Sequence, residues 1–393
     1  MVLEILCIGD VGNVIKTVSK FSKSNIHIIN WPKADAGHFT YDDEYELFEN
    51  YKVSDQVKKI NSIKNKFDLC IVMGTGERIA YLCDLNYICY YVGRDIDAPR
   101  FIKNSSEPWF SEPLHKLNIF ERNFYKKTFD SAIAHVAPIW VFDHLKKYTK
   151  SGIKMDRKPV DSKVFNDEIK PLEIPKKKFT FFCPQRMGIP KGTDILWNAL
   201  KFCKSDFEIL QVDWRDMGTK EEQETSLKIR ESRPKQVRLI PMIKRNEMPR
   251  YYKWSDAVIG NLRIGSYEYV EMEAVFSKKP VINFADPKIE IILDDKKINS
   301  PFLPKDNDPK TIAALIDKIV ESKEFRDELW KSEFNIVKEI TDPHKAAEWW
   351  DELFEKFAKK HKMTKNTPKI LLKFRLWSFL ISNRLYLKKL FRN

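Results

Sequence analysis

Two basic residues, Arg186 and Lys191, stand where the chain could hold a phosphate group. They follow the apolar run FTFFC at 179–183, and Lys191 opens a helical pattern behind Pro190. Arginine offers a bidentate fork and lysine a point charge, so two cations between a strand and a helix N-terminus suit a diphosphate. The alternative is a solvated loop with two ordinary basic residues, and the spacing R-x4-K alone does not decide between them.

A second segment with the same pattern of strand, loop and helix runs over 256–283. Gly265 and Ser266 form its loop, and its helix is expected to begin near Tyr267. The first backbone N–H groups of a helix have no partner within the helix, and glycine lets a ligand approach closely. This turn could therefore receive phosphate oxygens.

The helix of this second segment carries glutamates. Glu273 lies two turns into it and is followed by Ala274. A carboxylate at this place could accept hydrogen bonds from two ribose hydroxyls. The alternative is a surface glutamate, one of three together with Glu268 and Glu271.

Patterns of buried strands alternate with helical patterns along most of the chain, which predicts an α/β protein with parallel sheets. Strands are expected at 3–8, 26–29, 69–72, 87–92, 131–135, 179–183, 207–212, 237–240, 256–260 and 280–284. Helices are expected at 54–65, 113–128, 137–149, 309–322, 324–340 and 343–361. The stretch 150–178 has three prolines and no sustained period, so it is interpreted as an interdomain linker.

Length and cysteine content limit the class of protein. A chain of 393 residues is too long for one ordinary core and predicts about two domains. The six cysteines include no C-x-x-C pair and most lie in apolar runs, so buried, reduced thiols and a reducing compartment are expected. The sequence shows no signal-peptide pattern and no apolar run of about 18 residues, which favours a cytoplasmic protein.

The net charge of +13 is concentrated at the C-terminal end of the chain. From Phe357 to Asn393 there are eleven Lys and Arg and no acidic residue, which leaves 58 basic against 56 acidic residues elsewhere. A body that binds nucleic acid would show the opposite distribution. No nucleic-acid partner is therefore expected.

The order of these residues resembles the retaining glycosyltransferases of family 4, also described as glycosyl transferase group 1. The shared pattern is R-x4-K-G from Arg186, Asp256 before a short strand, and E-A-x5-P-V-I from Glu273. The segment KPVDSKVF at 158–165 is similar to the family's N-G-V-D-x-x-x-F. The resemblance covers about 179–345, and the N-terminal half shares only the alternation of strands and helices.

This resemblance implies a GT-B fold, in which two Rossmann-like domains face a cleft. It places an N-terminal acceptor domain at 1–165 and a nucleotide-sugar donor domain at 166–345. A helix at 346–366 would return to the N-terminal domain, and a basic amphipathic tail helix would occupy 367–393.

Roles on the donor side follow from the resemblance. Arg186 and Lys191 would be the catalytic residues, which hold the donor diphosphate and stabilise charge on the leaving nucleotide. Glu273 would bind the nucleotide ribose, and the backbone of Gly265 and Ser266 would donate to the sugar or phosphate.

One departure from the family concerns the glutamate that faces the donor sugar. The family has it eight positions before the ribose-binding glutamate, and this chain has Gly265 there. Glu268, from the next turn, is the residue that could reach in instead.

Three N-terminal residues are candidates for the acceptor side. Gly12 lies in the turn GDVGN after the first strand, where it serves either turn geometry or phosphate contact. Asp95, in VGRD, stands where some family members have His-Gly-x-Asp, and it either faces the cleft or caps the following loop. His135 ends a strand and is either an acceptor contact or a core histidine.

The resemblance and these residues predict a hexosyltransferase-type enzyme. It would move a sugar, with retention of configuration, from a nucleotide sugar to a glycan or a lipid-linked acceptor. The nucleotide sugar is a co-substrate, and neither a further cofactor nor a metal is expected, because the cations and the helix end could supply the positive charge. The alternative is a catalytically silent GT-B-like protein that binds nucleotides or glycans, which the glycine at 265 suggests.

The tail at 367–393 predicts a basic amphipathic helix. Thr367 and Pro368 are a typical helix start, and basic residues recur at multiples of three to four positions beside Trp, Phe and Leu. Such a helix fits an anionic membrane surface, which predicts peripheral attachment at the inner face of the membrane. The alternative is a helix that packs on the N-terminal domain or on a partner.

Overall fold

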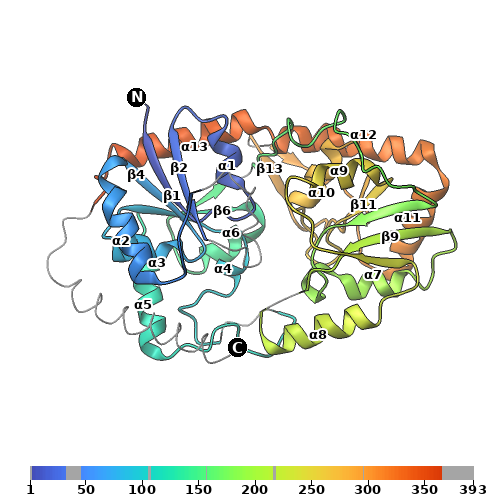
Figure 1. The fold of residues 1–393 in the computed structure, drawn as a ribbon, viewed down its shortest axis with the longest axis horizontal. Coiled ribbons are helices and arrows are strands. Elements are labelled where there is room, and N and C mark those ends of the chain that lie inside the picture. The colour runs from blue at the N-terminus through green and yellow to red at the C-terminus, as the bar shows by residue number, and fades with distance from the viewer. Residues whose placement is uncertain are drawn as a thin grey trace. The chain divides into compact units, whose positions relative to one another are not determined.

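The chain forms two compact units in the computed structural model, which describes residues 2–31, 46–104, 108–155, 157–215, 218–294 and 296–364 (Figure 1). Unit 1 comprises residues 1–105, 115–155 and the segment from Pro343 on. Unit 2 comprises 106–114 and 156–342. The chain passes between the units at 155/156 and 342/343, where the sequence analysis placed boundaries at 165/166 and 345/346.

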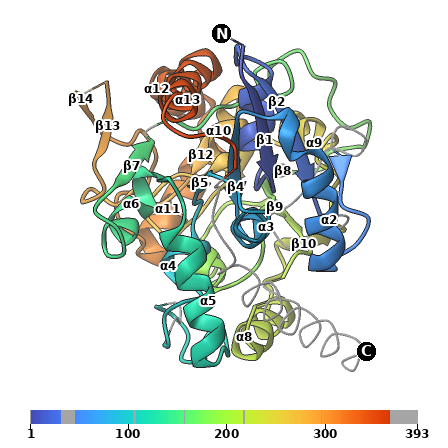
Figure 2. The same cartoon turned by 90° about the vertical axis from the view of Figure 1, so that its left-hand side faces the viewer.

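Unit 1 contains a parallel sheet, whose strand order over the described residues is β3-β2-β1-β4-β5-β6-β7 (Figure 2). The central strands are almost wholly buried, as expected for a parallel sheet that helices cover. The strands are β1 (Glu4–Ile8), β2 (Asn25–Asn30), β3 (Glu46–Leu47), β4 (Leu69–Met73), β5 (Tyr87–Tyr90), β6 (Ala134–Pro138) and β7 (Gly152–Met155). The helices are α1 (Val14–Ser19), α2 (Val53–Ile63), α3 (Gly76–Leu82), α4 (Arg94–Asp97), α5 (Ile119–Asp130), α6 (Ile139–Lys146) and α13 (Pro343–Ala358).

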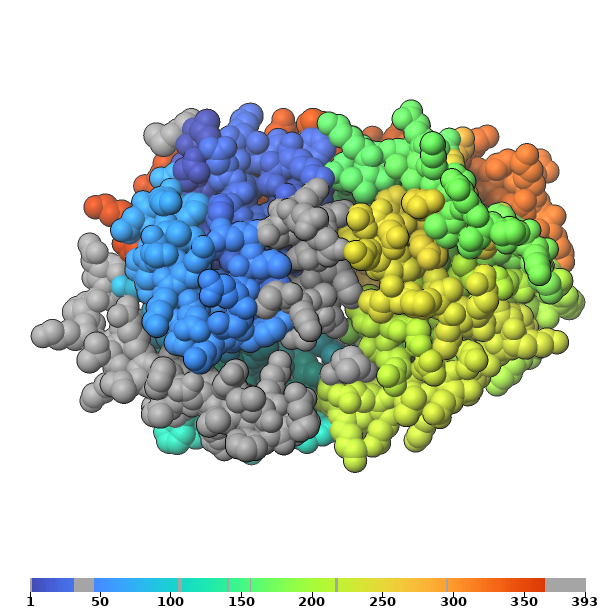
Figure 3. Space-filling view, viewed as in Figure 1, coloured from blue at the N-terminus to red at the C-terminus, as the bar shows by residue number. Residues whose placement is uncertain are grey.

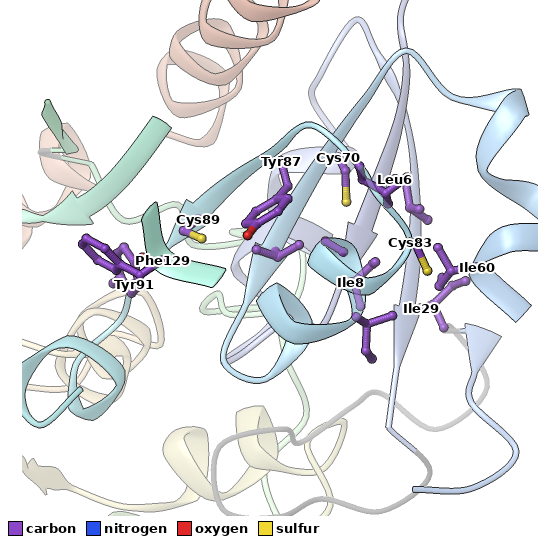
Figure 4. Packing of buried hydrophobic residues seen from close by; sticks show 14 of the residues in the cluster. Leu6, Ile8, Ile29, Ile60, Cys70, Cys83, Tyr87, Cys89, Tyr91 and Phe129 are labelled. Atoms are coloured by element: carbon purple, nitrogen blue, oxygen red, sulfur yellow. The ribbon is translucent and has the colours of Figure 1, made fainter. Parts of the chain in front are cut away.

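The core of unit 1 packs aliphatic, aromatic and cysteine side chains together (Figure 4). Ile8 of β1, Cys70 of β4 and Tyr87 of β5 have no exposed surface. All six cysteines are unpaired, and five of them are buried, which confirms the prediction of buried thiols. Burial raises the pKa of the Cys70 thiol well above its ordinary value, so this group stays neutral and unreactive.

The last described helix, α13, belongs to unit 1 although it follows the whole of unit 2 in sequence. The fully buried Trp350 packs edge-on against Tyr90 of β5, with ring centroids 5.3 Å apart. The carboxylate of Asp351 accepts hydrogen bonds from the hydroxyls of Ser22 and Ser24, at 2.6 and 2.8 Å. One apolar anchor and one polar anchor therefore hold the helix to the N-terminal sheet.

Unit 2 repeats the architecture with a smaller parallel sheet, ordered β10-β9-β8-β11-β12, and an antiparallel pair, β13-β14. The strands are β8 (Phe179–Cys183), β9 (Phe207–Val212), β10 (Val237–Ile240), β11 (Ala257–Ile259), β12 (Val281–Ile282), β13 (Ile291–Leu293) and β14 (Lys296–Ile298). The helices are α7 (Thr193–Ala199), α8 (Lys220–Glu231), α9 (Met248–Trp254), α10 (Tyr269–Phe276), α11 (Pro309–Glu321) and α12 (Lys323–Ile340).

Most predicted strands and helices are confirmed within a few residues, but the linker at 150–178 is wrong at its start. Residues Gly152–Met155 form β7, which pairs in parallel with β6 at the edge of the first sheet. An edge strand has one neighbour and is only partly covered, so its sequence, GIKM, lacks the apolar run that revealed the other strands. Residues 157–161 are buried, whereas 162–178 are mostly exposed and run over the surface of unit 2, drawn green in Figure 3.

The predicted membrane contact falls on the tail at 367–393, which lies outside the described residues. Within the part of the chain that the structure describes, every helix is too short or too polar to cross a bilayer.

Candidate active site

The candidate site of unit 2 lies where the order of its strands reverses. Strands β9 and β10 follow on one side of β8, and β11 lies on its other side. In open parallel sheets such a switch point opens a crevice at the carboxyl ends of the strands, where ligands bind. The loop with Arg186 and Lys191 leaves β8 there, and the loop with Gly265 and Ser266 leaves β11. The two predicted strand-loop-helix segments therefore meet at this edge of the sheet.

Asn261 ties these two loops together, and the sequence analysis did not identify it. Its side chain is fully buried and its amide donates to the carbonyl of Pro190 at 3.4 Å. Its side-chain oxygen accepts from the N–H groups of Arg263 and Ile264, at 2.8 and 3.0 Å. The backbone of Leu262 donates to the carbonyl of Lys191 at 3.2 Å. The position of Lys191 is thus fixed by the neighbouring loop.

Lys191 lies against Glu268. The ammonium group donates to the Glu268 carboxylate, and the lysine side chain is 14% exposed. Burial opposes the charge on Glu268, but Lys191 and Lys158 outweigh it and bring the pKa of Glu268 to about 2. The structure therefore joins two of the predicted site residues, and it keeps Glu268 in its charged form.

A second lysine, Lys158, lies beside this pair. It comes from the segment that resembles N-G-V-D-x-x-x-F and stands at the asparagine of that pattern. Its ammonium group is buried, donates to the carbonyl of Tyr267 at 3.0 Å, and lies 5.3 Å from the ring centre of Tyr269. Burial lowers the pKa of Lys158 well below its ordinary value, while the carboxylates of Glu268 and Glu271 oppose the shift.

The backbone at Gly265 cannot carry a side chain. Its φ is +77°, and a Cβ added there would lie 2.5 Å from the Cβ of Asp286. The backbone N–H of Asp286 donates to the Gly265 carbonyl at 2.9 Å, which holds the two segments together. The loop is therefore built for glycine, and the glutamate of the family pattern would not fit in this conformation.

Ser266 offers a buried hydroxyl to a ligand. Its side-chain oxygen has no hydrogen-bond partner among the described residues, although the residue is only 4% exposed. Its carbonyl accepts from the amide of Asn283 at 3.1 Å, which fixes the turn. A buried hydroxyl without a partner is costly, so a ligand oxygen at this turn would gain a ready donor.

The start of α10 differs from the expectation of an open helix end near Tyr267. The helix begins at Tyr269, and Glu271 accepts from the backbone N–H of Glu268 at 2.6 Å. Glu271 also accepts from the N–H of Asn261 at 3.0 Å. Two carboxylates therefore stand at this helix N-terminus. Phosphate is better placed at Lys191 and the Gly265–Ser266 turn than at the helix end.

Glu273 is buried and does not face Lys191. Its carboxylate accepts from both terminal nitrogens of Arg245, one of them at 2.9 Å, and from the hydroxyl of Tyr252 at 3.1 Å. Its side chain is 2% exposed, so the alternative of a surface glutamate is wrong. Binding of a ribose at Glu273 requires Arg245 to give up at least one of these bonds. Arg245 follows β10 and had no signal in the sequence that linked it to α10.

Arg186 lies in the same loop as Lys191 and is half-buried. The next residue, Met187, donates its backbone N–H to the carbonyl of Trp214 at 2.6 Å. This bond anchors the loop to the chain that leaves β9. Asp256, also part of the predicted pattern, accepts from the backbone of Thr180 at 2.8 Å and has a structural role before β11.

The candidates in unit 1 lie in two loops and in the core. Gly12 has a φ of +71° in the turn after β1, a conformation that favours glycine. The carboxylate of Asp95 accepts from the N–H of Gly93 at 3.0 Å, and burial raises its pKa to about 6. This geometry favours the loop-capping alternative for Asp95.

His135 is packed inside unit 1. Its ring stacks on Phe129 with centroids 4.2 Å apart, and its Nδ1 lies 3.0 Å from the hydroxyl of Tyr91. The residue is 4% exposed, and burial lowers its pKa to about 4. These contacts favour the core alternative over contact with an acceptor.

The low pKa of His135 predicts a loss of stability in acid. The unfolded chain binds a proton at this ring near pH 6.5, whereas the folded chain binds it only near 4. Stability is therefore present above pH 6.5 and falls toward pH 4, by about 3 kcal/mol for a shift of this size. The variant His135→Phe is expected to lose this part of the acid sensitivity.

The measurement is the thermal midpoint of the wild type and of His135→Phe between pH 4 and 7. The two chains must be compared as a difference, because burial raises the pKa of Glu77 to about 7, an effect of opposite sign. If the thermal midpoint changes with pH by the same amount in both chains, His135 is not the group that causes the acid sensitivity.

Among the described residues, no group of three or more His, Cys, Asp or Glu is arranged to hold a metal ion.

Comparison with known proteins gives a family for part of the chain and relatives for its fold. Residues 164–334 match the family described as Glycosyl transferases group 1, and no curated protein matches the chain. The fold is similar to Anabaena Alr3699/HepE in complex with UDP and glucose, at 15% identity and a TM-score of 0.63, covering 90% of this chain and 100% of that one.

Two further solved structures share the fold. Sucrose-phosphate synthase from Thermosynechococcus elongatus matches at 13% identity and a TM-score of 0.62, over 91% of this chain and 100% of that one. An α-glucosyltransferase in complex with UDP and a 13-mer DNA matches at 10% identity and a TM-score of 0.63, over 90% and 100%. Residues 164–334 are therefore similar to the glycosyl transferases of group 1, and the chain shares its fold with solved GT-B glycosyltransferases.

Proposed function

We propose that this chain is a retaining, metal-independent hexosyltransferase that moves a sugar from a nucleotide sugar to a glycan or a lipid-linked acceptor. The observation that carries the proposal is the bond between the loop of Lys191 and the loop after β11, which goes on to the Gly265–Ser266 turn at the switch point of unit 2. A partly buried cation on one loop and, on the other, a buried hydroxyl without a partner among the described residues suit a diphosphate and its sugar.

The reaction would break the bond between the anomeric carbon and the phosphate oxygen of the donor. The nucleoside diphosphate leaves with the bonding electrons, and the acceptor hydroxyl forms the new bond on the same face of the sugar. The proton of that hydroxyl passes to the departing phosphate oxygen. Lys191 and Arg186 would stabilise the charge that develops on this oxygen, which is the step where fixed cations lower the barrier most.

The first substrate to identify is the nucleotide sugar that serves as donor. UDP is bound in Alr3699/HepE and in the α-glucosyltransferase, so UDP-glucose is the first donor to test. The latter structure also contains DNA, whereas the near-neutral body of this chain favours a glycan or lipid-linked acceptor. The expectation that no nucleic acid binds therefore remains a prediction from charge.

Release of nucleotide from a panel of UDP-, GDP- and ADP-sugars tests the activity. The enzyme is expected to release one nucleoside diphosphate, with a sugar transferred either to an added glycan or to water. Binding of a nucleotide without any turnover would support the silent alternative, because the glutamate of the family pattern is absent at Gly265. A thermal-shift screen with the same nucleotides identifies the base independently of turnover.

We also propose that residues 367–393 attach the chain to the inner face of a membrane, which suits a lipid-linked acceptor. A chain truncated after Lys365 is expected to lose most of its binding to vesicles that contain anionic lipid, since each cation near such a surface contributes about 1 kcal/mol. Flotation of both chains with anionic and neutral vesicles measures this. Equal binding of the two chains to anionic vesicles would contradict the proposal.

A further inference from the structure

We propose that Lys158 is a positioning residue that accepts Glu268 as its ion-pair partner when a donor diphosphate takes Lys191. This inference rests on the proposed function, since it explains how Lys191 becomes available to the donor. In the structure as it stands, the Lys191 ammonium is already paired with the Glu268 carboxylate. A diphosphate that binds Lys191 must therefore compete with a carboxylate of the protein itself.

Separating the pair would leave Glu268 without a counter-charge unless another cation is near. A carboxylate that is half-buried and loses its partner is strongly destabilised, so such a competition would weaken donor binding. Lys158 meets this need. It is the second cation that lowers the pKa of Glu268, after Lys191 itself.

The contacts of Lys158 place it at the base of the turn that carries Glu268. Its Nζ donates to the carbonyl of Tyr267, the residue directly before Glu268, at 3.0 Å. The same Nζ lies 5.8 and 5.3 Å from the ring centres of Tyr267 and Tyr269, the residues on either side of Glu268. These contacts bring the Lys158 ammonium to the residues on both sides of Glu268.

The charge of Lys158 is itself difficult to explain by packing. The residue is 4% exposed in the apolar core of unit 2, where an uncharged side chain of similar length would fill the space at lower cost. Burial lowers its pKa to about 7 although Glu268 and Glu271 raise it, so the ammonium is charged in part of the molecules at neutral pH. When a diphosphate takes Lys191, Lys158 is the neighbouring cation that is left for Glu268.

A double-mutant cycle with nucleoside diphosphates tests the inference. Calorimetric titration with UDP, GDP and ADP finds the nucleotide that the wild type binds, and that nucleotide is the probe for every variant. A nucleoside diphosphate carries no sugar to transfer, so a contact between Glu268 and the donor sugar does not contribute to the measured affinity. Lys158→Met is expected to weaken binding about tenfold, which corresponds to the loss of one charge-assisted contact.

The variant Glu268→Gln is expected to tighten binding by about three- to tenfold, because it removes the competitor for Lys191. The double variant Lys158→Met/Glu268→Gln should return to within about threefold of the wild type. A residue that merely supports the fold would not be rescued by a change at Glu268. The exposed pair Lys297–Glu290 provides matched controls, since Lys297→Met and Glu290→Gln change the same charges in unit 2.

The effect of pH gives a second readout. The ratio of wild-type to Lys158→Met affinity is expected to fall toward one as pH rises above about 7, the pKa to which burial lowers Lys158. Unchanged binding in Lys158→Met, a double variant as weak as that single variant, or no tightening in Glu268→Gln overturns the inference. The test with Glu268→Gln alone stays decisive even if Lys158→Met fails to fold. A wild type that binds none of the three nucleotides overturns the proposed function as well.

Discussion

Replacement of Lys191 by alanine is expected to lower kcat for sugar transfer by about 100- to 1,000-fold, the usual cost of removing one group that stabilises charge in a transition state. Lys191 is a partly buried cation at the switch point, and its backbone is fixed by the neighbouring loop through Leu262. The variant removes the ammonium but leaves this backbone bond in place. The loss should therefore appear in kcat at saturating donor, and not only in KM.

The matched control for this variant is Lys201→Ala. Lys201 follows α7 in the same unit, is exposed, and donates to Asn198 at 2.8 Å. It is expected to leave kcat and KM unchanged. If Lys191→Ala raises KM with an unchanged kcat, the lysine contributes equally to binding of substrate and transition state, and the catalytic role assigned to it is wrong.

The sequence predicts the strands of both sheets because each is a buried apolar run between turn residues. The segment FTFFC, for example, becomes β8 with its last four residues buried. Since parallel strands end at the same edge, the loops after β8 and β11 could be expected to meet once both strands were recognised. The strand β7 was missed because it lies at a sheet edge and has no such run.

The side chains that complete the site could not be predicted in this way. Lys158 arrives from the connection between the units and Arg245 from the loop after β10, far from α10 in sequence. Their positions depend on tertiary packing, and this packing produces no periodic pattern of apolar residues in the sequence from which they could be predicted. The three glutamates at the start of α10 and within it show the same limit. They lie within six residues, yet Glu268 pairs with Lys191, Glu271 with backbone N–H groups, and Glu273 with Arg245.

Removal of the arginine that faces Glu273 is expected to destabilise unit 2 strongly. Arg245→Ala would leave the 2% exposed carboxylate of Glu273 with the Tyr252 hydroxyl as its remaining side-chain partner among the described residues. Breaking a buried ion pair from one side typically costs about 3–5 kcal/mol, because the other charge stays buried without compensation. Urea unfolding followed by circular dichroism measures the loss as a shift of the midpoint.

A surface ion pair that also has two hydrogen bonds separates burial from pairing as the cause of the lost stability. Arg238 binds Glu208 through two bonds of 2.9 Å, but its side chain is 50% exposed. Arg238→Ala is therefore expected to cost less than about 1 kcal/mol. The double variant Arg245→Ala/Glu273→Gln should recover part of the stability that Arg245→Ala loses, since no buried charge remains. A midpoint for Arg245→Ala equal to that for Arg238→Ala would mean that Glu273 finds water or another donor, and that its carboxylate is open enough to bind a ribose directly.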